Sequence, residues 1–152
     1  MFLEMEKKII EQVKKIFQGA DERNWQKAAD VMDNHVMLIY SSMTGSPASL
    51  LTPQQITSAW AAFLPGFDRT NHKLSDFTVQ IKNDEVSVTY QGVADHFYNS
   101  KVWTVEGSYT TRLKLINNNW LVTAQTFHFK QQSGDTTLPS EVSKKMQIIE
   151  MT

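Results

Sequence analysis

"EVSVTYQGVADHFYN", residues 85–99, alternates apolar and polar side chains along most of its length. This period of two is typical of a strand with one buried and one solvent-facing side. Residues 72–82, 101–116 and 119–131 continue the same pattern, and short segments rich in Asn and Asp separate several of these stretches. Together the four segments predict an antiparallel meander of long strands.

The residues that precede the meander favour helices. Apolar residues between positions 9 and 17 recur at the three-to-four spacing of one helical face, and Gly19 is the expected end of this helix. Residues 25–32 predict a second, short helix, for which either Asp21 or Asn24 could be the N-cap. The N-terminal part of the chain is therefore expected to supply two helices.

A third helix has the clearest start signal. Residues 35–40 predict a short apolar strand, and a loop rich in Ser and Gly follows it. Thr52 can then act as the N-cap, Pro53 fits the first helical position, and Gln55 completes a capping box. One strand and one further helix are thus expected before the meander begins.

This order of elements predicts an α+β fold, in which N-terminal helices pack on one face of a strongly curved, mostly antiparallel sheet. The length of 152 residues favours a single domain with one core. We expect that domain to span residues 1–132. The tail, residues 133–152, begins with Gly, Ser and Thr and could form a short helix or close over a pocket as a lid.

The composition excludes several classes of function. A net charge of -1 offers no basic excess for a phosphate backbone, so nucleic acid is not an expected partner. The absence of cysteine excludes disulfides, thiolate catalysis and Cys-based zinc sites. No apolar run is long enough to span a membrane, and the first ten residues are too charged for a secretory signal. The expected location is therefore the cytoplasm.

Several short motifs occur in an order that resembles one known family. They are "ADERNW" (20–25), "HVMLIY" (35–40), "TPQQITSAW" (52–60), "TNH" (70–72), "ADHF" (94–97), "VEGSYTTRL" (105–113) and "NNNWLV" (117–122). The series resembles the nuclear transport factor 2-like superfamily, and in particular its SnoaL-like branch, which includes scytalone dehydratase and a dehydrochlorinase. The resemblance covers most of the chain. It implies a cystatin-like α+β barrel, whose sheet curls around the helices and leaves a conical pocket.

The resemblance also implies a site that removes a proton from carbon without a cofactor while a leaving group departs. An aspartate of both enzymes corresponds to Asp21 and a histidine to His72, and the dehydratase also matches at Tyr40 and His96. His72 would be the base, and Asp21 would orient it and stabilise its charge. His96 and Tyr40 would bind or protonate the leaving oxygen. The dehydratase has a tyrosine at the position of Ala20, so no complete site of one enzyme carries over.

Each of these residues also has a purely structural interpretation. Asp21 could cap the second helix, and His72 could be an exposed residue at the start of a strand. His96 shares the parity of inward-facing strand residues, where it could be a hydrogen-bonded core histidine. Tyr40 and Tyr109 could likewise be core tyrosines with paired hydroxyls. The residue types alone leave these alternatives open.

The ligand expected for a pocket in this fold is an apolar, aromatic or polyketide-like small molecule. The candidate substrate-binding residues are Tyr109, Trp60, Phe63, Phe67, Trp103 and His128. His128 is included because it shares strand parity with Val122 and Thr126, which would bring it to the pocket mouth. No metal is expected, because no short ligand motif such as H-x-x-x-H occurs, and no cofactor is expected, because there is no nucleotide fingerprint.

Two functions other than catalysis remain open. The same pocket could bind a hydrophobic ligand without chemistry, or the outer face of the sheet could serve as an interaction surface. The residues expected on that face are Thr104, Glu106, Ser108, Thr110, Arg112 and Lys114. Their polarity suits either solvent or a wet interface, and the resemblance implies a homo-oligomer, either a dimer or a trimer.

Overall fold

The computed structural model describes residues 2–151, with side chains described for residues 3–149. Residues 1 and 152, the outer ends of the predicted domain and tail, lie outside the described residues. The strands are β1 (Met32–Ile39), β2 (Ser49–Leu51), β3 (Arg69–Lys82), β4 (Glu85–Tyr98), β5 (Lys101–Ile116) and β6 (Asn119–Gly134). The helices are α1 (Phe2–Glu22), α2 (Trp25–Ala29), α3 (Ser41–Thr44), α4 (Pro53–Ala61), the 3-10 helix η1 (Leu64–Gly66) and α5 (Leu138–Met151).

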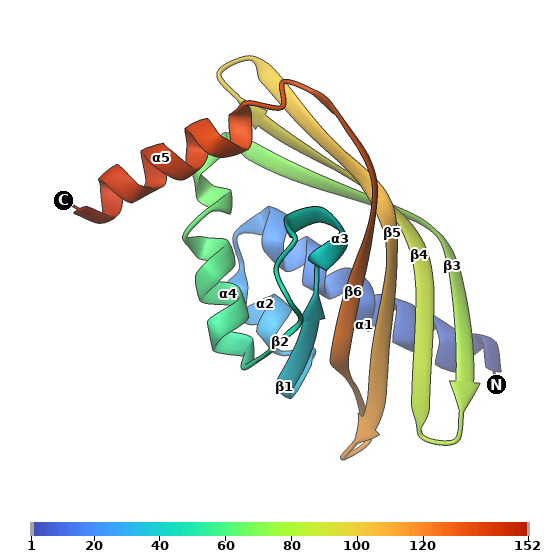
Figure 1. The fold of residues 1–152 in the computed structure, drawn as a ribbon. Coiled ribbons are helices and arrows are strands. Elements are labelled where there is room, and N and C mark those ends of the chain that lie inside the picture. The colour runs from blue at the N-terminus through green and yellow to red at the C-terminus, as the bar shows by residue number, and fades with distance from the viewer. Residues whose placement is uncertain (1, 152) are drawn as a thin grey trace.

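The strands form one curved sheet in the order β2-β1-β6-β5-β4-β3. Strands β3 to β6 make the predicted antiparallel meander, and β1 joins its β6 side in parallel. Figure 1 shows α1, α2 and α4 on one side of the bent sheet. The predicted α+β class is confirmed, but β2 and β3 remain separate edges, so the sheet curves without closing into a barrel.

The first helix continues past its expected end. α1 runs to Glu22, and Gly19 lies inside it, where a Cβ atom would come within 2.8 Å of Ala28 N and Asn24 O. Gly19 is therefore required for the close approach of α2, and it does not end the helix. Of the two candidate caps, Asn24 accepts the hydrogen bond from the Lys27 backbone N–H. Asp21 is thereby left free for another role.

The helix before the meander has the predicted start. Thr52 and Gln55 form a complete capping box at the N-terminus of α4, and Pro53 occupies its first turn. The preceding segment, expected to be a loop, contains the short helix α3 and the short edge strand β2. Both changes are local, and they place α3 directly after Tyr40.

An extra residue in β6 reverses which side chains face inward. Arg112 pairs with Ala124, whereas the next residue of β5 pairs with Val122, so Thr123 is a β-bulge. After the bulge the inward positions are Gln125 and Phe127, both buried. His128 therefore points outward, and the expectation that it reaches the pocket mouth is wrong. The six polar residues of β5 expected on the outer face do lie there, each half-buried or exposed.

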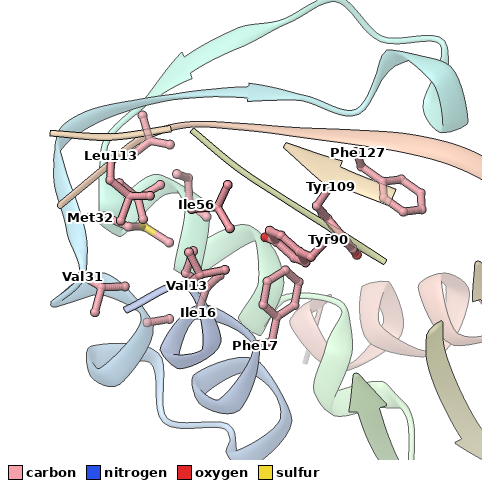
Figure 2. Close-up of a cluster of buried hydrophobic side chains, with 14 of the residues drawn as sticks. Val13, Ile16, Phe17, Val31, Met32, Ile56, Tyr90, Tyr109, Leu113 and Phe127 are labelled. Atoms are coloured by element: carbon pink, nitrogen blue, oxygen red, sulfur yellow. The ribbon is translucent and has the colours of Figure 1, made fainter. Parts of the chain in front are cut away.

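The core fills the space between α1, α4 and the inner face of the sheet. Its fully buried side chains include Val13 and Ile16 of α1, Ile56 of α4, and Leu113 of β5. Figure 2 shows this apolar cluster, with Phe17 directed toward Tyr90 and Tyr109. Packing against the helices is therefore aliphatic at one end of the sheet and aromatic toward the other.

The C-terminal helix packs on the turn that precedes β3. Val142 of α5 lies so close to Gly66 that a Cβ atom at Gly66 would collide with it. The Lys145 ammonium donates a hydrogen bond to the Gly66 carbonyl (2.9 Å) and lies 4.6 Å from the centre of the Tyr98 ring. These contacts fix α5 against η1 and the end of β4.

Candidate functional site

A cavity of about 400 Å³ lies between the aromatic end of the sheet and the helices α1, α3 and α4. Its lining residues are Ile16, Phe17, Ala20, Tyr40, Met43, Thr44, Ala59, Trp60, Phe63, Leu64, His72, Ala94, His96, Trp103, Val105, Tyr109 and Phe127. Among these, Thr44 and Ala59 are exposed, so the cavity opens between α3 and α4. The volume suits a small organic molecule.

On one side of the cavity, the end of α1 meets the start of β3. The His72 ring donates from Nδ1 to Asp21 Oδ1 (2.7 Å), and the His72 backbone N–H donates to Asp21 Oδ2 (2.8 Å). The Thr70 hydroxyl also donates to Asp21 Oδ1 (2.9 Å), and Arg23 donates from Nη1 to the Thr70 oxygen (3.1 Å). We call these four residues, Asp21, Arg23, Thr70 and His72, the histidine side of the cavity.

The hydrogen bonds to Asp21 determine its protonation state. Burial acts to raise the pKa of the Asp21 carboxyl, but the hydrogen bonds and charge of His72, together with Thr70, bring its pKa below the ordinary value. Asp21 is therefore an ionised acceptor at neutral pH, and it holds a hydrogen of the His72 ring at Nδ1. The other ring nitrogen, Nε2, is left without a partner among the described residues, and His72 lines the cavity.

Arg23 holds the histidine side in place. Its backbone has a left-handed φ of 58°, which turns the chain out of α1. Its guanidinium donates to the carbonyls of Leu64 (2.9 Å) and Phe67 (3.3 Å) as well as to Thr70. One side chain thereby joins α1, η1 and the start of β3, and fixes the carboxylate that lies between them.

His96 adds a second imidazole to the same cavity. It is buried on β4, and its ring centre lies 6.2 Å from that of His72. Its Nδ1 donates to the Trp103 carbonyl (3.1 Å), because a carbonyl oxygen can only accept. Burial lowers the pKa of His96 to about 4, so the ring is neutral at pH 7. Its Nε2 is therefore an acceptor, which favours a role in binding over one as a proton donor.

The opposite side of the cavity carries a buried chain of hydrogen bonds. Gln125 Nε2 donates to the Tyr40 hydroxyl (2.7 Å), and the Thr111 hydroxyl donates to Gln125 Oε1 (3.4 Å). The hydroxyls of Thr111 and Tyr90 are 2.7 Å apart. Burial raises the pKa of Tyr40 to about 12, although the hydrogen bond from Gln125 lowers it in part. We call these four residues, Tyr40, Tyr90, Thr111 and Gln125, the tyrosine side.

Aromatic rings form the floor between the two sides. Phe17 lies 5.4 Å from the His72 ring and 5.0 Å from Tyr109, measured between ring centres. Phe127 continues the series, at 4.8 Å from Tyr109 and 5.7 Å from Tyr40. Burial raises the pKa of Tyr109 well above its ordinary value, so its hydroxyl stays protonated. Apart from the Tyr109 hydroxyl, the floor is thus apolar, with polar atoms at its two ends.

The structure brings most of the predicted site residues together. Asp21 lies directly behind His72, and the other predicted catalytic and binding residues that line the cavity are Tyr40, His72, His96, Tyr109, Trp60, Phe63 and Trp103. Phe67 does not line it, because it packs behind Phe63 and Trp103 in the core. His128 lies on the outer face, where its ring is 3.3 Å from the Thr110 hydroxyl.

Sequence patterns did not indicate the residues that support the site. Arg23, Thr70 and Thr111 were not selected, and neither was Gln125, whose inward direction depends on the β6 bulge. The alternation of β5 could have identified Thr111, since it shares the parity of Tyr109. Among the described residues no cluster of His, Asp or Glu could hold a metal ion, and no helix is long and apolar enough to cross a membrane.

Known structures share this fold at low sequence identity. A protein from Kribbella flavida superposes with a TM-score of 0.81 and 18% identity, covering 91% of this chain and 96% of its own. A candidate scytalone dehydratase from Novosphingobium aromaticivorans gives 0.71 and 14%, covering 86% and 87%. A hexachlorocyclohexane dehydrochlorinase from Novosphingobium barchaimii gives 0.74 and 10%, covering 88% and 92%. These likenesses show the fold.

Sequence comparison identifies the family. No curated protein matches the chain. A family model described as the SnoaL-like domain, of the nuclear transport factor 2-like type, matches residues 1–126, which include β1 to β5, α1 to α4 and the cavity-lining residues except Phe127. The chain therefore belongs to the SnoaL-like domain family.

Proposed function

We propose that this protein is a cofactor-independent lyase or isomerase that abstracts a proton from carbon in an apolar, carbonyl-bearing small molecule. The observation that carries the proposal is the Asp21–His72 pair, whose free His72 Nε2 faces an apolar cavity of about 400 Å³. A neutral imidazole can accept a proton, and the carboxylate behind it stabilises the imidazolium that forms.

The two sides of the cavity fit the two ends of such a reaction. His72 takes the proton from the carbon next to the carbonyl, while Tyr40 donates a hydrogen bond to the carbonyl oxygen, on which negative charge develops. His96 accepts a hydrogen bond from the leaving hydroxyl. In an elimination, the new C=C bond forms as the carbon–oxygen bond breaks, and the imidazolium returns its proton to the departing oxygen, which leaves as water.

The cavity favours neutral, flat substrates. No lysine or arginine is among the lining residues, so a carboxylate or phosphate group would have no cation to pair with. The aromatic floor formed by Phe17, Tyr109 and Phe127 suits a ring system that stacks against it. The names of two structural neighbours, a dehydratase and a dehydrochlorinase, both denote eliminations and support the same class.

Hydrogen–deuterium exchange tests the proposal without knowledge of the natural substrate. 2-Tetralone is a neutral bicyclic ketone with acidic hydrogens next to its carbonyl, and its exchange in D₂O can be followed by proton NMR. We expect the protein to accelerate this exchange above that of free imidazole at equal concentration. Exchange no faster than imidazole, with saturable ketone binding, would show that the cavity binds such ligands without performing the chemistry.

The second candidate function is non-catalytic binding of a hydrophobic ligand, and one observation favours it. The cavity wall is almost wholly apolar apart from His72, His96 and the two tyrosines, so affinity for a hydrophobic ligand does not require the Asp21–His72 pair. In that case Asp21→Asn should leave the affinity for 2-tetralone unchanged, and no exchange should be detected with either protein.

We further propose that the chain acts in the cytoplasm as a homo-oligomer, a dimer or trimer, joined through the outer face of the sheet. The helices α1, α2 and α4 lie on one side of the sheet (Figure 1), and the outer face presents half-buried polar residues such as Thr104, Glu106 and Ser108. Sedimentation equilibrium tests this. A mass of 17.4 kDa at all concentrations would exclude it, and an Arg112→Glu variant should weaken the association.

A further inference from the structure

The hydrogen-bond chain on the tyrosine side has a buried end and an open end. Tyr90 is 1% exposed, and its hydroxyl has Thr111 as its one hydrogen-bond partner among the described residues. Tyr40 lies at the other end and lines the cavity. The polar atoms of four side chains, one directly after β1 and the others on β4, β5 and β6, are thus connected in a single series.

The buried end fixes the direction in which every hydrogen points. Tyr90 can place its hydroxyl hydrogen only on Thr111, so Thr111 must direct its own hydrogen to Gln125 Oε1. The Gln125 amide then presents Nε2 to the Tyr40 oxygen. If the amide were turned over, Thr111 would donate to Tyr90, and the Tyr90 hydrogen would have no acceptor in the core, which folded proteins avoid.

We propose that Gln125, Thr111 and Tyr90 are positioning residues that aim the hydroxyl hydrogen of Tyr40 into the cavity. The oxygen of Tyr40 already accepts from Gln125, so its hydrogen is left for a ligand. This end of the cavity therefore selects an acceptor, namely a carbonyl oxygen. The inference rests on the proposed function for the identity of the site, but its test measures binding and does not depend on turnover.

The two ends of the cavity consequently differ in hydrogen-bonding polarity. The Nε2 atom of the neutral His96 ring is an acceptor, whereas Tyr40 is a donor. A ligand of matching polarity carries a carbonyl at the Tyr40 end and a hydroxyl or an acidic C–H group at the histidine end. The same molecule placed the other way round would bring its carbonyl to the His96 acceptor, so the polarity also selects the orientation of binding.

The test compares two ligands that differ at one position. 1-Tetralone carries a carbonyl oxygen, and 1-methylenetetralin carries a CH₂ group of similar size in its place. We expect the protein to bind the ketone about tenfold more tightly, which corresponds to one hydrogen bond. We also expect the carbonyl stretch of the bound ketone to move to lower wavenumber in infrared difference spectra, because a donor polarises the bond.

Variants of the chain identify the source of that preference. Tyr40→Phe should abolish both the preference and the spectral shift. Gln125→Met and Thr111→Val should reduce both, because each leaves the Tyr40 hydrogen free to turn away from the cavity. Thr111→Ser restores the hydroxyl and should restore both effects. Thr110→Val, on the outward-facing neighbour, is the matched control and should behave as the unaltered protein.

The outcomes separate this inference from the proposed function. A ketone preference that Tyr40→Phe removes but Thr111→Val and Gln125→Met leave unchanged, in variants whose circular dichroism matches the unaltered protein, would overturn the positioning role. Equal affinity of the unaltered protein for both ligands would overturn it as well. A preference that follows these variants, in a protein that does not exchange the hydrogens of 2-tetralone, supports the inference and refutes the proposed catalysis.

Discussion

The histidine side and the tyrosine side of the cavity are built in different ways. The histidine side joins Asp21 at the end of α1 to His72 on β3, residues far apart in the chain, through an ionised carboxylate. The tyrosine side runs between strands through neutral groups, from Tyr90 to Tyr40. The difference teaches that one cavity can hold an imidazole paired with a carboxylate at one end and a tyrosine hydroxyl at the other, each fixed by its own partners.

Loss of the His72 ring should have the largest effect on the proposed chemistry. In His72→Gln the side chain can still contact Asp21 but cannot take a proton from carbon. We expect the exchange of 2-tetralone to fall about a hundredfold or more, toward the rate in buffer. His128→Gln, on the outer face, is the control and should retain the full rate. Equal rates in the two variants would remove His72 from the role of base.

Removal of the Asp21 charge should have the next largest effect on the rate of 2-tetralone exchange. Asp21→Asn replaces an obligatory acceptor by an amide that can also donate, so the hydrogen of His72 is no longer held at Nδ1. We expect the exchange rate to fall about a hundredfold, with the affinity for the ketone little changed. Glu22→Gln is the matched control, since Glu22 is the exposed neighbour on the same helix. A rate in Asp21→Asn close to that of the control would show that the carboxylate is structural.

Acid should destabilise the fold through His96. Its folded pKa of about 4 lies below the ordinary 6.5, so the unfolded chain binds more protons as the pH falls below 6.5. The free energy of unfolding should therefore decrease by about 2–3 kcal/mol between pH 7 and pH 4.5. The lowered pKa of Asp21 adds its loss only at still lower pH, as the pH falls below 3.8. Urea titrations at the two pH values measure the change.

His96→Asn tests the assignment of that pH effect. The asparagine amide can donate to the Trp103 carbonyl as the histidine Nδ1 does, but it does not titrate. The free energy of unfolding of this variant should be lower than that of the unaltered protein at pH 7, and it should change much less down to pH 4.5. An undiminished pH dependence would locate the titrating group elsewhere.

The Tyr40 hydroxyl should contribute least to the rate of 2-tetralone exchange. Tyr40→Phe keeps the ring in contact with Phe127 but removes the hydrogen bond to a developing enolate oxygen. We expect the exchange rate to fall about tenfold. A loss as large as that of His72→Gln would mean that proton abstraction depends equally on both sides. The control is Tyr98→Phe, outside the cavity lining.

The sequence could predict the fold because its main signals are local. Alternation marks the four long strands, and the Thr52 capping box marks α4. The candidate pair Asp21 and His72 followed from the family resemblance, and the structure places their side chains 2.7 Å apart. Asn24, and not Asp21, caps α2, so the interpretation of the aspartate as a helix cap is wrong.

The placement of the other site residues depends on local irregularities of the backbone, which a periodic sequence pattern does not predict. One bulge at Thr123 exchanges the inner and outer positions of β6, so that Gln125 faces the cavity and His128 faces solvent. The left-handed turn at Arg23 brings its guanidinium to η1 and to the start of β3, both distant in the sequence. Phe67, directly after the 3-10 helix η1, is buried against Phe63 and Trp103 and does not line the cavity.

The cavity contains two of the four tryptophans of the chain, Trp60 at its opening and Trp103 deeper in its wall. The other two, Trp25 and Trp120, are not among its lining residues. Indole emission depends on the polarity around the ring, so an occupied cavity should change the intrinsic fluorescence of the unlabelled protein. The molecule therefore carries its own optical reporter, with which a library of neutral ketones could be screened in solution.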